Sequence, residues 1–275
     1  MVTIYKGEVV MTKQREIRLG FVDLGDDAYP DSSKVYQLKS ASDISMAKIP
    51  FPDGSPEKRL DLTLISLFIE DLPDFTSNNE GLLKIDINTR NPQNTDDRKE
   101  ISSGVEFEVK DKNYAPGIDN RGVFRNIIFR DFVNLGLKLV EIDSDLSETY
   151  NKVKGIVNGV EGLETLDVLN GIPYLEVATG LVDGIINVFG KNEDDVVWSN
   201  LPLLDVEPGP GSAFLRTGIY VAYQVSNESE NNEVNHSDLV YKDGKIEIKD
   251  GVHIPGGISN CLAFSVRLRS FTPKS

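Results

Sequence analysis

Asp143 and Asp145 are the residues whose types and spacing best suit metal chemistry. They stand two positions apart, directly after an apolar run that ends at Ile142. In an extended backbone, side chains two positions apart point to the same side, so both carboxylates could share a hard cation such as calcium. The same segment also fits a helix start, because Ser144 or Asp145 followed by Glu148 matches a capping box. Both interpretations stay open on the sequence alone.

Other catalytic chemistry has little support from the residue types. The chain has one cysteine, Cys261, and two histidines, His236 and His253. Cys261 lies in a strand-like run, where a buried and inert thiol is expected. The histidines have no metal-ligand spacing to each other or to the cysteine, so neither a zinc site nor a cysteine–histidine dyad is expected.

Paired carboxylates would suit a hydrolase, and Glu70 with Asp71 or Glu141 with Asp143 are such pairs. Acidic residues are abundant along the whole chain, so these pairs have almost no diagnostic value. The sequence also has no phosphate-cradling glycine loop and no nucleophile elbow. We therefore expect a protein that is not an enzyme, with a carboxylate-based hydrolase as the least favoured alternative.

The charge of the chain excludes some partners. The 275 residues carry a formal net charge of -15. Nonspecific nucleic-acid binding needs basic side chains, and anionic lipid would repel this chain unless a divalent cation intervened. No segment resembles a signal peptide, and no run approaches the ~20 apolar residues of a membrane span. We expect a cytoplasmic or otherwise soluble protein.

Asp143 and Asp145 lie at the end of a central stretch, Gly122 to Asp145, whose pattern is typical of two strands. A β-prone run extends from Ile127 to Val133, and a second run extends from Leu137 to Ile142. Asn134 and Gly136 have turn chemistry and predict the connection between them. We interpret this stretch as the centre of a β-sandwich.

Alternating segments elsewhere support the same class of fold. Leu60 to Leu72 alternates and then shifts phase at Ile65, which predicts a bulge or burial on both faces. Asp243-Gly244 between two short apolar runs predicts a hairpin. The regular run from Leu262 to Leu268 predicts a strand inside a sheet, with Arg267 and Arg269 facing outward. The predicted fold is mainly β, an antiparallel β-sandwich.

The chain is expected to divide into residues 1–58 and 59–275. The first part combines strands with a long loop from Asp26 to residue 58 that contains several prolines. Loops of this length in a compact domain tend to be functional or to cover another surface. We interpret residues 1–58 as an arm or a part of the sandwich, and 59–275 as the sandwich with a helical insertion.

Residues 60–145 contain, in order, LTLISLFIEDLPDFTSNNEGLLKIDIN, then GVFRNIIFRDF, then LKLVEIDSD. This order of segments resembles the calcium-and-lipid-binding sandwich known as the C-two domain. It implies Asp71 or Asp74 as ligands in a first loop, and Asp143 with Asp145 as the pair in a second loop. The family's other first-loop aspartate has no counterpart, since Asn78, Asn79 and Glu80 occupy that place. The resemblance therefore implies weak calcium binding or none.

After Asp145 the pattern changes to helical periodicity. Apolar residues at steps of three and four predict an inserted helical pair over about 145–190, whose second helix covers 173–189. That second helix is apolar on most of its surface and must be covered. Its own sandwich, another protein chain and a membrane are the three possible coverings, and the first is favoured because large exposed apolar patches are rare.

Three functions follow from these features. The leading hypothesis is a non-catalytic binding or assembly module that acts through a protein partner or through self-association. The second is a calcium-assisted membrane-associating or toxin-like effector, in which calcium or the apolar helix 173–189 makes the membrane contact. The third is the hydrolase. No cofactor is implied with certainty, and calcium is the candidate.

Overall fold

The described part of the chain is mainly β. The computed structural model describes residues 2–5, 8–11, 17–22, 24, 30–31, 33–41, 57–70, 78–90, 98–129, 133–141, 196–198, 203–206, 212–225, 235–254 and 257–271. These residues form antiparallel sheets and contain no α-helix, so the predicted fold class is confirmed at this level. Within them, no helix has the length and apolar character needed to cross a membrane.

In the described part of the chain, a short 3-10 turn, η5 (His236–Asp238), lies between β15 and β16. The bounds of the strands are β1 (Val2–Tyr5), β2 (Glu8–Met11), β3 (Ile17–Val22), β4 (Tyr36–Gln37), β5 (Lys39–Ser40), β6 (Glu57–Ile69), β7 (Asn78–Arg90), β8 (Arg98–Lys110), β9 (Asn113–Tyr114), β10 (Arg121–Phe129), β11 (Val133–Glu141), β12 (Val196–Trp198), β13 (Leu203–Asp205), β14 (Ser212–Phe214), β15 (Gly218–Val225), β16 (Leu239–Lys242), β17 (Lys245–Ile248) and β18 (Ile258–Phe271).

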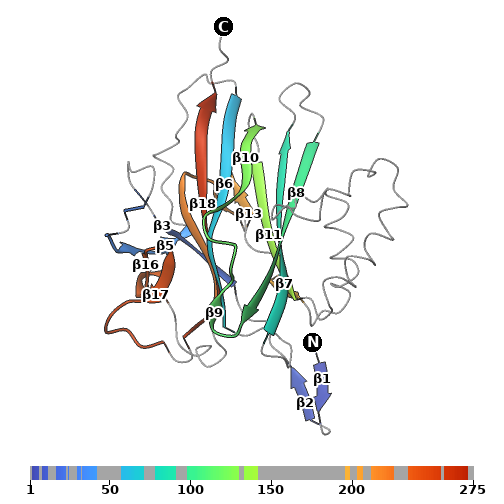
Figure 1. Cartoon of the computed structure of the whole chain (residues 1–275), viewed down its shortest axis with the longest axis vertical. Helices are drawn as coiled ribbons and strands as arrows, with labels where there is room; N and C mark the ends of the chain where they lie inside the picture. Colours follow the sequence, from blue (N-terminus) through green and yellow to red (C-terminus); the bar gives the residue numbers. More distant parts are fainter. Residues whose placement is uncertain are drawn as a thin grey trace, which may run out of the picture.

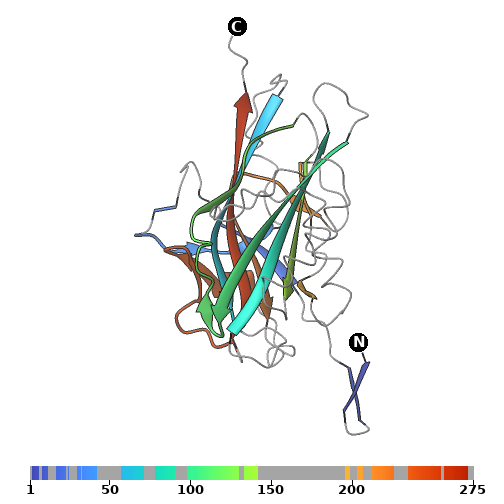
Figure 2. The same cartoon turned by 45° about the vertical axis from the view of Figure 1, so that its right-hand side comes forward.

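Two large sheets make up most of the described structure (Figure 1). The seven-stranded sheet has the order β10-β6-β18-β15-β3-β5, with β9 also paired to β6, and all its pairs are antiparallel. The six-stranded sheet has the order β14-β13-β11-β7-β8, with β12 also paired to β11. Among the described strands of that sheet, the β13–β14 pair is parallel and the other pairs are antiparallel. Figure 2 shows the long strands of both sheets from a second direction.

One hydrophobic core joins the two large sheets. Side chains alternate across a strand, so each sheet can turn one apolar row toward the other. The shared core takes Leu60, Leu62 and Leu64 from β6 and Leu83, Ile85 and Ile87 from β7, all fully buried. We call the opposite side of the seven-stranded sheet its outer face. A second core lies there, against the three-stranded sheet β17-β16-β4.

A β-bulge at Ile65 explains the phase shift in the sequence of β6. Ala263 pairs with Ser66 and the next residue, Phe264, pairs with Leu64, so Ile65 is the extra residue. The bulge keeps Leu64 and Leu67 in the shared core and places Ile65 in the second core. The predicted bulge is thus confirmed, and it changes which side chains reach the outer face beyond it.

The central stretch divides between the two sheets. β10 pairs with β6 in the seven-stranded sheet, whereas β11 pairs with β7 in the six-stranded sheet. The predicted turn at Asn134 and Gly136 is wrong, because both residues pair with β7 inside β11. Nine consecutive ladder pairs outweigh the turn preference of two residues, since strand propensity depends strongly on tertiary context.

The predicted hairpin at Asp243-Gly244 is confirmed. It joins β16 to β17, and both turn residues have positive φ, 47° at Asp243 and 79° at Gly244. This is the backbone of the tight turn that matches the right-handed twist of paired strands. The hairpin, with β4 beside it, covers part of the outer face of the seven-stranded sheet.

Strands from the first and last parts of the chain, β3 and β18, belong to the seven-stranded sheet. β3 pairs with β15, and β18 lies between β6 and β15, so the strand predicted at Leu262 to Leu268 does pair inside a sheet. Near the start of the chain, β1 and β2 pair as a hairpin in a separate two-stranded sheet. The helical pair predicted for about 145–190 lies outside the described residues, which contain no such pair.

Candidate interaction site

The outer face of the seven-stranded sheet carries a cluster of charged side chains beyond the part that the hairpin covers. Outward positions of β6 and β18 alternate with core positions, and the register places Arg269 opposite Arg59 and Arg267 opposite Asp61. Asn126 of β10 completes the group. We call these five residues the arginine cluster.

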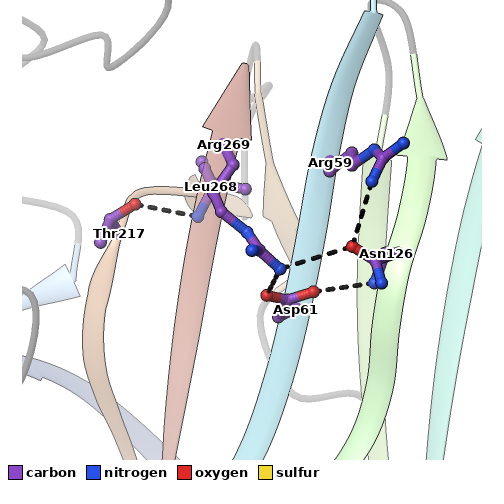
Figure 3. A network of polar contacts seen from close by, with 6 residues as sticks. All are labelled: Arg59, Asp61, Asn126, Thr217, Leu268 and Arg269. Atoms are coloured by element: carbon purple, nitrogen blue, oxygen red, sulfur yellow. Dashed lines mark hydrogen bonds and ion pairs between the residues drawn. The ribbon is translucent and has the colours of Figure 1, made fainter. Parts of the chain in front are cut away.

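Asp61 is the centre of the arginine cluster (Figure 3). Its Oδ2 accepts from Nη2 of Arg269, and its Oδ1 accepts a 2.8 Å bond from the backbone N–H of Asn126. The side-chain oxygen of Asn126 accepts a weaker 3.4 Å bond from Nη1 of Arg59. These contacts join β18, β6 and β10 and hold the side chains in one arrangement.

The irregular backbone of β10 places Asn126 within reach of Asp61. The ladder with β6 shifts register between Gly122 and Phe124 and again between Phe124 and Ile127. Asn126 lies in the second irregularity with φ 56°, in the left-handed region that asparagine tolerates better than most residues. Irregularities of this kind re-aim groups at a sheet edge. Here the backbone N–H of Asn126 points toward the Asp61 carboxylate, and its side-chain oxygen lies within reach of Arg59.

A further hydrogen bond holds β18 to the loop between β14 and β15. The backbone N–H of Leu268 donates to Oγ1 of Thr217 at 3.0 Å (Figure 3). Since β15 begins only at Gly218, this side chain continues the pairing of β18 beyond the end of its neighbour. The strand that carries Arg267 and Arg269 is therefore fixed on both sides.

The arginine cluster holds three guanidinium groups and one carboxylate, in a chain whose net charge is -15. The Arg269 side chain is 42% exposed and that of Asp61 is 19% exposed, so the cluster is accessible. Guanidinium groups stay protonated and bind carboxylate or phosphate oxygens through paired N–H donors. Chemically, this surface is suited to bind an anionic group.

The four predicted calcium ligands cannot be placed, because Asp71, Asp74, Asp143 and Asp145 lie outside the described residues. The two glutamates of the predicted carboxylate pairs are described. Glu70 follows β6, and Glu141 ends β11 with a buried side chain. Among the residues that the structure describes, no three His, Cys, Asp or Glu side chains group around a common metal position.

The Cys261 thiol and the His236 imidazole occupy structural positions. Cys261 is buried as predicted, and burial raises the pKa of its thiol to about 12. The Nε2 of His236 lies 3.1 Å from the carbonyl oxygen of Leu19, and its ring packs edge-on against Tyr223. His253 is exposed. These contacts place His236 against the second core, away from the arginine cluster.

Sequence reasoning identified only part of the arginine cluster. The alternation of β18 predicted that Arg267 and Arg269 face outward. The contributions of Arg59, Asp61 and Asn126 depend on the pairing of β6 with β18 and on the bulges of β10, which alternation does not specify. A usable signal was present, because Arg59 and Asp61 share the face opposite the Leu60–Leu62–Leu64 row.

Comparison of the chain with protein-family models, with curated proteins and with solved structures finds no match.

Proposed function

We propose that this protein is a non-catalytic binding module that acts through protein–protein contacts, with the arginine cluster as its contact surface. The proposal rests on one observation: an ordered set of guanidinium groups on an accessible part of a strongly acidic molecule. The proposed partner is an acidic protein segment, since its carboxylates match paired guanidinium donors. Local complementarity of this kind guides association even where the net charges repel.

The proposed scaffold is an antiparallel β-sandwich formed by the two large sheets. It is supported by the shared core, which takes side chains from both of them. A rigid sheet suits a contact surface, because side chains on paired strands hold their spacing when a partner binds. The resemblance to the C-two domain and the calcium ligands that it implies stay predictions.

A peptide of about ten glutamates is a suitable first probe, because it presents only carboxylates. We expect fluorescence anisotropy to detect binding at low ionic strength and to show a steep loss of affinity as salt increases. The double substitution Arg59→Gln with Arg267→Gln should weaken binding at least about tenfold, since it removes two of the guanidinium groups.

Lys245→Gln with Lys249→Gln is the matched control, because both lysines are exposed and lie in or directly after β17. This control removes the same charge and should leave the affinity within about twofold. Equal losses in the two double variants would assign the binding to net charge and would refute the arginine cluster as the contact surface. Light scattering with calcium and with chelator then shows whether the partner is a second copy of the chain.

A further inference from the structure

A cavity of about 340 Å³ lies between the outer face of the seven-stranded sheet and the β16–β17 hairpin. Its apolar lining comes from both sides: Phe68 on β6 and Ile258 on β18 from the sheet, and Ile246 and Ile248 on β17 from the hairpin. Small-molecule sites are typically mostly apolar cavities of this size or larger, with a few polar groups. The arginine cluster contributes no residue to this cavity.

The bulge in β6 and a short strand pairing preform the cavity. Beyond Ile65, the hydroxyl of Ser66 donates a 2.5 Å bond to the carbonyl oxygen of Gly244 and so ties the hairpin turn to the sheet. Tyr114 pairs with Phe68 through β9, and their rings lie 5.2 Å apart at an angle of 57°. Both walls are thus fixed by hydrogen bonds that do not depend on a ligand.

The polar groups of the lining favour one kind of ligand. Burial raises the pKa of Tyr114 to about 12, and nearby Cys261 and Glu247 act in the same direction. Burial also raises the pKa of the Cys261 thiol to about 12. Both groups are therefore neutral at physiological pH. Among the described residues of the lining, Glu247 is the one that carries a charge. The ammonium of Lys245 lies over the Tyr114 ring, 5.2 Å from its centre.

We propose that this cavity binds a small aromatic amine. The ring would lie among Phe68, Ile246, Ile248 and Ile258, and the ammonium group would meet the Glu247 carboxylate at the rim. At the packing density of protein interiors, a cavity of this volume holds a ligand of roughly a dozen non-hydrogen atoms. This inference is independent of the proposed function, because it uses a different part of the outer face.

Tryptamine, tryptophol and indole-3-acetate form a matched series of probes, since they share an indole ring and differ in the charge of the side chain. We expect tryptamine to bind with a dissociation constant between about 10 μM and 1 mM, as is typical of ligands of this size. Tryptophol should bind about threefold to fivefold more weakly, since an exposed ion pair contributes little, and indole-3-acetate more weakly still. Isothermal titration calorimetry measures the series.

Cys261 gives an independent readout at the site, because it is the only cysteine of the chain and it lines the cavity. Saturating tryptamine should slow the labelling of Cys261 by methyl methanethiosulfonate at least about threefold, with adduct mass measured on the intact protein. Tryptamine that binds and leaves the labelling rate unchanged would overturn the assignment to this cavity. The absence of any calorimetric binding would overturn it as well.

Two variants test the roles of the lining residues. Glu247→Gln should abolish the preference for tryptamine over tryptophol and leave tryptophol affinity unchanged, whereas Glu108→Gln, an exposed glutamate of β8, should preserve the preference. Ile248→Phe should fill the cavity and weaken all three probes. If Ile248→Phe fails to fold, the comparison of Glu247→Gln with Glu108→Gln decides. A preference for tryptamine over tryptophol that survives in Glu247→Gln refutes recognition of the amine by this carboxylate.

Discussion

Tyr220 fixes the passage of the chain from one large sheet to the other. Its hydroxyl accepts a 2.7 Å bond from the backbone N–H of Arg216 and donates a 2.7 Å bond to the carbonyl oxygen of Phe214. Phe214 ends β14 in the six-stranded sheet, and Tyr220 belongs to β15 in the seven-stranded sheet. The ring packs against Phe21 and Phe264 at centroid distances of 5.0 Å and 5.5 Å.

Tyr220→Phe removes only the hydroxyl and keeps the ring. We expect this substitution to reduce the free energy of unfolding by about 1–3 kcal/mol, because a donor and an acceptor of the backbone lose a buried partner. Urea unfolding measures the change. Tyr36→Phe is the control, since the Tyr36 hydroxyl accepts an exposed bond from the N–H of Asp31 and its loss should cost less than about 0.5 kcal/mol. Equal effects would contradict the role of Tyr220.

Strand β10 lies at the edge of the seven-stranded sheet. Its pairing with β6 shifts register twice, and Asn126 has a left-handed backbone conformation. The backbone of Asn126 adopts φ 56°, and its N–H donates to Asp61. Its side-chain oxygen accepts from Arg59. The backbone effect is separable from the side-chain effect, because glycine also adopts this conformation and alanine does so only with strain.

Asn126→Ala should therefore lower the free energy of unfolding by about 1–2 kcal/mol more than Asn126→Gly does. Both variants lack the amide that accepts from Arg59, so the difference between them reports only the backbone of the bulge. Chemical denaturation of the two proteins under the same conditions gives the comparison. If alanine proved as stable as glycine, the left-handed conformation at residue 126 would be refuted.

The sequence predicts which segments are strands and which faces are buried, but it does not predict which distant strands pair. Alternation identified β18 and the phase shift of β6, because a buried face imposes a period of two. It did not identify their partnership, since a strand pattern specifies which face is buried and leaves the neighbour open. The cavity could not be predicted for the same reason. Phe68, Tyr114 and Ile248 come together through the pairing of β6 with β9, of β6 with β18 and of β16 with β17.

For the whole molecule, several buried acids predict a loss of stability at high pH. Burial raises the pKa of Cys261 from 9.0 to about 12, and it raises those of Tyr114 and Tyr241 from 10.0 to about 12. Burial also raises the pKa of Tyr220. The folded protein thus holds protons that the unfolded chain releases, so stability is complete below the unfolded pKa values and is lost as pH rises toward 12.

We expect the free energy of unfolding to begin to fall near pH 9 and to decline further up to pH 12. In Cys261→Ala the decline should begin near pH 10, because the tyrosines then titrate first. Urea unfolding across this pH range gives the free energy of unfolding of both proteins. The charge repulsion that both share at high pH cancels in the difference between the two values. An identical onset in both would show that the thiol does not contribute.

The central position of β18 determines when the seven-stranded sheet can assemble on a ribosome. β18 separates β6 from β15, and β3 reaches the rest of the sheet only through β15. The chain emerges in sequence order, so β6 waits for nearly two hundred residues before β18 supplies its long partner. During that interval the edge of β6 that faces away from β10 has no strand partner, and unpaired strand edges favour aggregation. Nascent chains of this protein should therefore depend on holdase chaperones until β18 leaves the exit tunnel.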